Sequence, residues 1–258
     1  MSPQNKPMGL LGAARKAGVT GTAVIVAGAA LAGCSGLAST QTETQQVSFD
    51  HQIERIEFHL DSGGITLTPG DQGRVGIDRK LTWTEDRPSF TEEWQGNVLK
   101  ITSTCDGRHC SADYTVRVPA AVAVKAFTEA GTINAQAIQG DQELQTGAGD
   151  IKVSDAAGRL SATTKAGNIT AGGLSSGVAS ADTQSGNLNL GFAKAPSQVT
   201  ARSQAGNVKV TVPRDGQQYK VEADTKAGRK DVDVAQAPAG PGTITVHSDA
   251  GDVSVHSA

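Results

Sequence analysis

Aromatic side chains are scarce in this sequence, because Phe, Trp and Tyr together make up 3% of its 258 residues. Methionine is scarcer still, with Met1 and Met8 alone, both near the N-terminus. Glycine, by contrast, is frequent, with 31 residues. Few large side chains and many glycines are typical of a narrow β fold with many tight turns, and they argue against a globule packed on aromatic rings.

Basic clusters are also missing. The chain has a formal net charge of -3, and beyond residue 33 it keeps 20 basic and 26 acidic residues, a balance of -6. Proteins that bind nucleic acids usually present a basic patch that neutralises phosphates. We therefore expect no nucleic-acid partner.

The N-terminal segment, residues 1–33, has three basic residues followed by an apolar run of small residues from about residue 17 to residue 32. The run is short and rich in Ala, Gly and Val, so it predicts a signal peptide better than a membrane-spanning helix. Residues 34–46 are rich in Ser, Thr, Gln and Gly, a composition that predicts a flexible tether.

The junction Leu31-Ala32-Gly33-Cys34 resembles the lipobox of bacterial lipoproteins. This resemblance implies cleavage after Gly33 and lipidation of Cys34, which would anchor the protein in the cell membrane on its extracytoplasmic face. The alternative is an ordinary signal peptide, or an uncleaved anchor, with an incidental cysteine.

The stretch Thr164-Lys165-Ala166-Gly167-Asn168-Ile169 recurs along the second half of the chain. Its copies are spaced by 18 to 23 residues, a period that predicts an all-β fold, a parallel β-helix (β-solenoid) of about seven rungs over residues 120–258. We expect structural corners at Gly131, Gly149, Gly167, Gly186, Gly206, Gly228 and Gly251. The copy at Gly228 has two extra residues before its apolar pair, Val232 and Val234.

Alignment of the copies places apolar residues in two inward columns on each strand and leaves a polar outer face of mixed sign. A column of Thr and Ser precedes the corners and could bond from rung to rung. A second column contains Asp150, Asn168, Asn187, Asn207 and Asp252. We interpret it as turn residues, since Asn and Asp tolerate left-handed backbone, and the alternative is a set of calcium ligands.

Residues 47–119 depart from the repeat, although Ser62-Gly63-Gly64-Ile65 echoes it as an early rung or cap. The rest of this region holds both tryptophans, Trp83 and Trp94. We expect an antiparallel, sandwich-like elaboration that packs over the first rungs, with the tryptophans in its core. A role for them in stacking a ligand is the alternative.

Cys105 and Cys110 flank a short loop that contains His109. In an oxidising compartment these two cysteines predict a disulfide. A metal site with His109 is the alternative, but a structural zinc needs four ligands and no second Cys or His pair has suitable spacing.

Tyr114-Thr-Val-Arg-Val-Pro119 and the corners after it resemble the bacterial putative-adhesin family, a group of unknown function built as a right-handed parallel β-helix. The resemblance covers residues 47–255, about the whole chain beyond the leader and tether. It implies the fold and a surface location, and it brings no catalytic residues.

Three functions fit these features. The first is a non-enzymatic, membrane-anchored surface lipoprotein, adhesin-like, that binds an envelope polymer or a surface protein. The second is a carbohydrate-binding or carbohydrate-active β-helix, but such enzymes need clustered carboxylates, whereas outward acids such as Asp182 and Glu222 are scattered. The third is an accessory lipoprotein of an envelope-stress system. We expect the first, with no catalytic residue, no cofactor and no metal.

Overall fold

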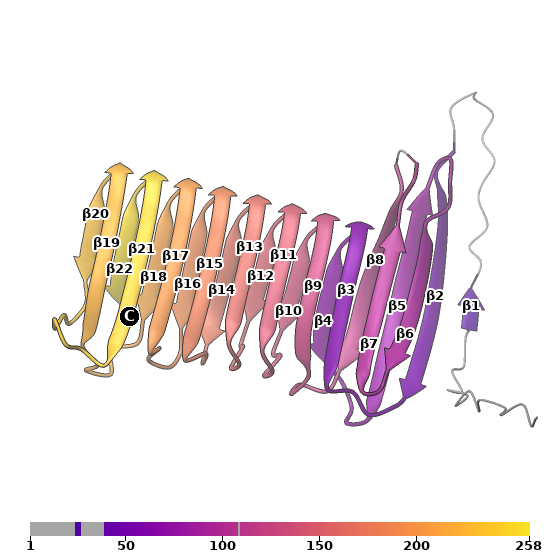
Figure 1. Cartoon of the computed structure of the whole chain (residues 1–258), viewed down its shortest axis with the longest axis horizontal. Helices are drawn as coiled ribbons and strands as arrows, with labels where there is room; N and C mark the ends of the chain where they lie inside the picture. The colour runs from indigo at the N-terminus through magenta and orange to yellow at the C-terminus, as the bar shows by residue number, and fades with distance from the viewer. Residues whose placement is uncertain (1–23, 27–38, 108) are drawn as a thin grey trace, which may run out of the picture.

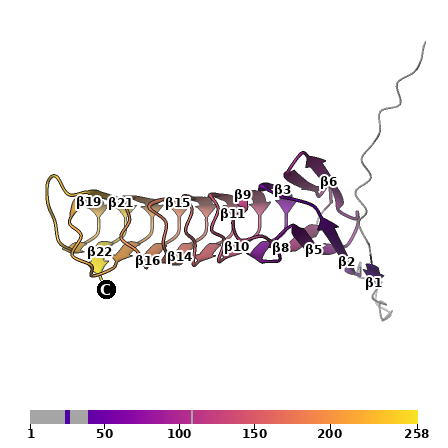
Figure 2. The same ribbon diagram turned by 90° about the horizontal axis from the view of Figure 1, so that it is seen from below.

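The computed structural model describes residues 24–26, 39–107 and 109–258, and within these ranges the chain is all β. Figure 1 shows an elongated stack of strands whose long axis runs across the strand directions. No helix of the described ranges could cross a membrane. The strands form two sheets that face each other along the stack, as the end-on layers in Figure 2 show.

Sheet A has twelve strands. Their spatial order is β1 (Val24–Val26), β2 (Gln41–Asp50), β5 (Arg74–Trp83), β8 (Ser111–Val118), β4 (Ile65–Pro69), β10 (Ile133–Gln136), β12 (Ile151–Ser154), β14 (Ile169–Leu174), β16 (Leu188–Phe192), β18 (Val208–Val212), β22 (Val253–Ser257) and β20 (Lys230–Asp233). The pairs from β8 to β20 are parallel, and those from β1 to β8 are antiparallel.

Sheet B has ten strands. Their spatial order is β19 (Tyr219–Ala227), β21 (Gly242–Ala250), β17 (Gln198–Ala205), β15 (Val178–Ser185), β13 (Leu160–Ala166), β11 (Gln142–Ala148), β9 (Ala123–Ala130), β3 (Arg55–Ser62), β7 (Val98–Thr104) and β6 (Ser89–Gln95). Only β6 and β7 pair in the antiparallel sense within this sheet.

Each rung consists of one strand from sheet B, a corner and one strand from sheet A. The alternation predicted from the sequence places Ile133, Ile151 and Ile169 in register on neighbouring strands, and all three are fully buried. Small residues such as Ala162 and Ala181 face them from sheet B. The repeat is therefore solenoid-like, with a thin core between two parallel-rich sheets.

The predicted boundary between residues 119 and 120 does not separate two structural units. Strand β3 pairs with β9, and β4 pairs with β10, so the first half of the chain contributes a rung to the same stack. The echo at Gly63 is the corner of this rung, next to the corner at Gly131. The antiparallel strands expected from the sequence are present, but they extend the two sheets at the end of the stack and do not pack over the first rungs. Strands β2 and β5 extend sheet A, and β6 extends sheet B.

The prediction of a flexible tether over residues 34–46 is wrong for residues 41–46. These residues form the first part of β2, which pairs with β5 along all ten of its residues. The inward side chains are polar in this half of the strand, so the apolar alternation that marks a buried strand is missing. Gln45, for example, points inward and accepts a hydrogen bond from the Arg79 guanidinium.

The rungs at the C-terminal end do not stack in chain order. The last rung, β21 and β22, pairs with β17 and β18 on one side and with β19 and β20 on the other. The rung that precedes it in sequence therefore ends the stack (Figure 1). This order differs from the sequential stacking that the repeat suggests.

The register of β20 also corrects the alignment made from sequence. Lys230 pairs with Val253 and Val232 pairs with Val255, so Lys230 stands in the inward column and no extra residues precede it. An inner rung would bury Lys230 without a partner, at a high cost in free energy. At the end of the stack Lys230 is exposed.

Candidate functional site

The corner glycines form one column along the stack. Their spatial order is Gly63, Gly131, Gly149, Gly167, Gly186, Gly206, Gly251 and Gly228. At Gly186 φ is +153°, and a Cβ would lie 1.9 Å from the carbonyl oxygen of Gly167. Successive rungs therefore approach too closely at the corner for any side chain.

A column of hydroxyl groups joins each corner to its neighbour. The Thr146 hydroxyl donates to the carbonyl oxygen of Gly131 at 2.9 Å. The same bond recurs from Thr128, Thr164, Thr183, Ser203, Thr225 and Ser248. These are the rung-to-rung bonds that the Thr and Ser column in the sequence suggested.

The Asp and Asn column makes a second ladder at the corner. The Asn187 amide N–H donates to Asn168 Oδ1 at 2.9 Å, and the Asn207 N–H donates to Asn187 Oδ1 at 2.8 Å. These oxygens accept backbone hydrogen bonds from the neighbouring rung, and none of the five residues has positive φ. The column therefore links the rungs, and the left-handed backbone expected from the sequence is not found at these positions. Within the described ranges, no group of three or more His, Cys, Asp and Glu side chains is placed to hold a metal ion.

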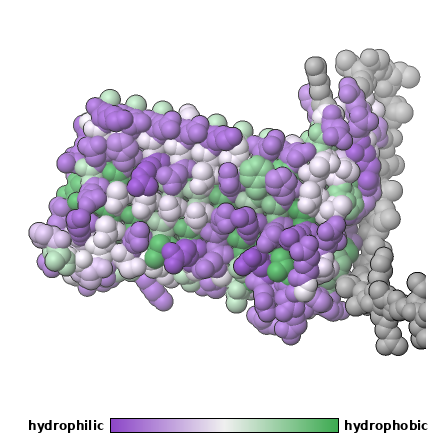
Figure 3. Space-filling model, viewed as in Figure 1, coloured by the Kyte–Doolittle hydropathy of each residue, from purple (hydrophilic) through white to green (hydrophobic). Residues whose placement is uncertain are grey.

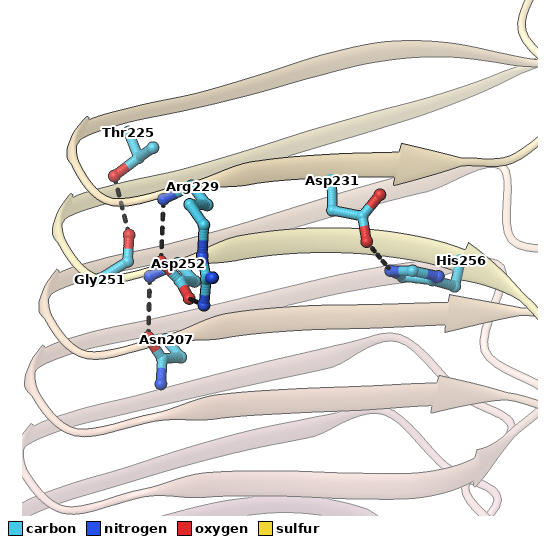
Figure 4. A network of polar contacts seen from close by, with 7 residues as sticks. All are labelled: Asn207, Thr225, Arg229, Asp231, Gly251, Asp252 and His256. Atoms are coloured by element: carbon cyan, nitrogen blue, oxygen red, sulfur yellow. Dashed lines mark hydrogen bonds and ion pairs between the residues drawn. The ribbon is translucent and has the colours of Figure 1, made fainter.

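The terminal rung is held to the stack by polar contacts at the corner, which Figure 4 shows. The Arg229 N–H donates to Asp252 Oδ1 at 2.8 Å, and its guanidinium reaches Oδ2 at 3.0 Å. These bonds hold the pKa of Asp252 below its usual value. Farther along the strands, His256 Nε2 lies 3.3 Å from the carboxylate of Asp231. These bonds from Arg229 and Asp231 all reach the rung of β21 and β22, and Asp252 in turn bonds Asn207 at the next corner.

The outer face of sheet B is polar, and many of its charged side chains form ion pairs with one another. Figure 3, seen from the side on which this sheet faces the viewer, shows hydrophilic residues with scattered apolar patches. Lys125 pairs with Glu143 at 3.1 Å, and Lys226 pairs with Asp249 at 2.6 Å. This face fits the mixed sign predicted for the outer surface.

An aromatic pair also lies on that face. The rings of His59 and Phe127 stack with centroids 4.8 Å apart and planes 21° apart. The two residues are 68 positions apart in sequence but neighbours in register. The sequence contains no motif that links them, and only the stacking of β3 on β9 identifies the pair.

The outer face of sheet A has a different composition. We call its outward positions on β10, β12, β14, β16, β18 and β22 the amide–hydroxyl face. They are Asn134, Gln136, Lys152, Ser154, Thr170, Gly172, Asn189, Gly191, Lys209, Thr211, Ser254 and His256. None of these positions is acidic or apolar. The column of Lys209 continues to Asp231 on the terminal strand β20.

The N-terminal end of the stack contains a buried charge. Arg79 points inward from β5, is 5% exposed, and forms an ion pair with Glu92 of β6. Its guanidinium lies over the Phe90 ring, 3.3 Å from the centroid. Burial raises the pKa of Glu92, and Arg79 opposes that shift. Burial also raises the pKa of Tyr114 to about 12. No sequence motif marks this cluster, because Arg79 has no sequence neighbour that identifies it as buried.

Both tryptophans pack against the core and remain half-buried. Trp94 contacts the rings of Phe49, at 5.7 Å, and His51, at 4.3 Å. Trp83 lies 5.9 Å from the guanidinium of Arg87. The two therefore occupy separate environments, and the structure does not bring them together as one stacking platform.

Cys105 and Cys110 form a disulfide between β7 and β8, with Cα atoms 5.6 Å apart. The alternative of a metal site with His109 is thereby excluded for the bonded cysteines. Cys34 lies outside the described residues, as does most of the predicted signal peptide. Within that segment Val24–Val26 forms β1, which pairs with β2.

A family model matches residues 46–257 of the chain, from the middle of β2 to the end of β22. The chain belongs to the Toastrack DUF4097 family. The match includes both the antiparallel N-terminal strands and the parallel rungs of this Toastrack chain. The family model therefore spans both regions that the sequence predicted, residues 47–119 and residues 120–258.

Solved structures with a likeness to this Toastrack chain include a putative adhesin from Bacteroides fragilis. It is 12% identical with a TM-score of 0.46, and the alignment covers 86% of this chain and 100% of that one. A putative cell adhesion protein from Clostridium sporogenes is 11% identical with a TM-score of 0.36, covering 85% and 100%. No curated protein matches the chain in sequence.

Proposed function

We propose that this protein is a membrane-anchored surface lipoprotein on the extracytoplasmic face of the cell membrane, where it serves as an adhesin-like, non-enzymatic scaffold for an envelope polymer or surface partner. The proposal includes the finer architecture, a parallel β-helix of about seven rungs over residues 120–258, spaced by 18 to 23 residues, next to the rung of β3 and β4. One observation carries it: two exposed polar sheet faces run the length of a stack that the corner ladders hold together. Such a surface suits repeated contacts with an extended ligand.

The proposed anchor has a geometric consequence. Cys34 precedes Gln41, the first residue of β2, by seven residues. Even fully extended, this segment spans at most about 24 Å. The N-terminal end of the stack would therefore stay near the membrane, and the terminal rung β19 and β20 would be distal. Cleavage after Gly33 would also remove β1 and leave β2 as the edge of sheet A.

Metabolic labelling with an alkyne fatty acid tests the anchor. Bacteria that express the full chain should incorporate the label and retain the protein in membranes, and added protease should cleave it from the outside. Cys34→Ala should lose both label and membrane retention. A labelled Cys34→Ala variant, or a wild-type chain that protease cannot reach, contradicts the proposal.

Two further assays address the scaffold role. Cells that display the full chain should adhere to purified envelope material better than cells expressing Cys34→Ala at the same level. The purified full chain should release no reducing sugar from a panel of polysaccharides. Turnover that a point substitution abolishes would replace the scaffold proposal with the carbohydrate-active alternative.

A further inference from the structure

The two outer faces of the stack differ in how many of their side chains form ion pairs or hydrogen bonds with one another. On sheet B, charged residues pair between rungs, as Lys125 does with Glu143 and Lys226 does with Asp249. On the amide–hydroxyl face, side chains on β10 to β18 form no ion pair and no side-chain hydrogen bond within the described part of the chain. Their polar groups are therefore available to a ligand.

The lysines of this face have no carboxylate beside them. Lys152 and Lys209 are both exposed and stand in one column with Thr170 and Asn189 between them. They lie three strands apart, roughly 14 Å at about 4.8 Å per strand. At the far end of this column Asp231 is already engaged by His256. Two lysines without an ion-pair partner in one column favour an anionic ligand, even though the net charge of the chain is negative.

The carboxylates nearest to the face on its N-terminal side are engaged too. Asp78 pairs with Arg117 at 2.8 Å, and Asp113 accepts a hydrogen bond from the Gly64 N–H at 2.7 Å. Asp155 directly follows β12, and its carboxylate lies beside Gly173 of β14, at the edge of the face. The charged side chains at the outward positions of β10 to β18 themselves, Lys152 and Lys209, are both positive.

Two glycines on neighbouring strands leave the middle of this face without side chains, so the backbone there forms a floor. Neither Gly172 nor Gly191 has positive φ. A Cβ on Gly172 would meet nothing within 4 Å, and a Cβ on Gly191 would lie 3.9 Å from the Cα of Gly172. Packing therefore does not require glycine at either position, although glycine weakens a strand. Adjacent strand glycines of this kind permit close approach of a ligand to the backbone.

We propose that the amide–hydroxyl face binds a linear anionic glycan, which runs along the stack with its charged groups on Lys152 and Lys209. The Asn, Thr and Ser side chains hydrogen-bond its hydroxyl groups, and the floor at Gly172 and Gly191 admits its rings. A protein partner fits less well, because the face lacks the apolar and aromatic residues that form the centre of protein interfaces. This inference rests on the proposed function and names its ligand class and site.

Binding to the full-length chain in lipid vesicles tests the inference with three probes. The probes are polygalacturonate, which carries carboxylates, phosphorylated dextran, which carries phosphates, and neutral dextran, which has the same backbone without charge. We expect saturable binding to polygalacturonate or phosphorylated dextran that weakens with added salt, and which of the two binds identifies the anionic group. Equal binding to dextran, or no binding to either anionic polymer, would overturn the proposal.

Matched variants locate the site. Lys152→Gln/Lys209→Gln should weaken binding about fivefold, since two exposed charge pairs of about 0.5 kcal/mol each amount to about 1 kcal/mol. Lys125→Gln/Lys165→Gln removes the same charge from the outer face of sheet B and should leave the affinity within about twofold. Equal loss in both variants would show non-specific attraction and overturn the site.

A steric variant gives a second, charge-independent readout. Gly191→Gln raises the floor without changing the charge, and it should also weaken binding while the circular dichroism of the chain stays unchanged. Unchanged affinity in this folded variant would show that the ligand does not lie over the floor at Gly172 and Gly191, and would overturn that part of the proposal. Failure of polymer binding with normal lipidation at Cys34 would overturn this inference alone, whereas loss of lipidation would contradict the anchor.

Discussion

The hydroxyl of Thr225 donates a 2.8 Å hydrogen bond to the carbonyl oxygen of Gly251, which lies 26 residues later in the chain. Every other bond of this hydroxyl column runs to a glycine earlier in sequence, as from Ser248 to Gly206. The reversal marks the place where the last rung of the chain enters between two earlier ones. The rung at the end of the stack is thus the one of β19 and β20, which has Lys230 in its inward column.

Engineered disulfides should report this order. Ala205 pairs with Ala250, and Ala250 pairs with Ala227, so Ala205→Cys/Ala250→Cys should cross-link in a Cys34→Ser background. Ala205→Cys/Ala227→Cys should not, because two strand spacings exceed the Cα separation that a disulfide allows. Mass spectrometry under non-reducing conditions distinguishes the two. Stacking in chain order would give the opposite result.

Loss of one amide from the corner ladder should lower stability modestly. Asn187 accepts from the Asn207 N–H and donates from Nδ2 to Asn168 Oδ1, so Asn187→Ala should cost about 1 kcal/mol in the free energy of unfolding. Asn134→Ala is the matched control, since Asn134 makes no side-chain hydrogen bond within the described ranges. Urea denaturation measures both, and equal midpoints would contradict the ladder's role.

A methyl group at a corner should be far more harmful than one on the sheet. Gly186→Ala combines φ +153° with a contact of 1.9 Å to a backbone oxygen, and we expect a loss of about 3 kcal/mol or more. Gly172→Ala meets nothing within 4 Å and should be neutral or slightly stabilising. Thermal unfolding of the two variants checks the difference, and similar melting temperatures would argue against tight corner stacking.

The buried Arg79–Glu92 pair should make stability depend on pH. Burial raises the pKa of Glu92 above 4.5 in the folded state, so the folded chain holds this proton more tightly than the unfolded chain does. The stabilisation from this group is then complete below pH 4.5 and is lost as the pH rises through the folded pKa. Glu92→Gln removes that dependence.

Denaturation midpoints of the wild type and Glu92→Gln between pH 4 and pH 8 provide the measurement. The midpoint of the wild type should fall relative to that of the variant as the pH rises. Glu93→Gln is a suitable control, because Glu93 is the exposed neighbour on the same strand. A constant difference between wild type and Glu92→Gln would show that Glu92 does not titrate in this range.

Much of the chemistry of the corners could be predicted from the sequence of a single rung. The Thr and Ser column, the Asn and Asp column and the disulfide all follow from short segments, and the structure shows the bonds that each makes. The His59–Phe127 pair and the buried Arg79 were not readable, because each depends on a neighbour from a distant strand. The start of β2 was missed for a related reason, since its inward residues are polar and find partners only in the folded stack.

The sequence by itself determined the rung: strands with alternating small apolar residues, joined by a glycine corner. Those properties are local, because side-chain alternation and backbone φ depend on a few consecutive residues. Tertiary structure alone determined the order of the rungs at the C-terminal end and the register of Lys230. Parallel pairing is non-local, so similar rungs can stack in more than one order, and burial selects among those orders. The apolar rung with Ile244 and Val253 fills the interior, and the charge-rich rung remains at the solvent-exposed end.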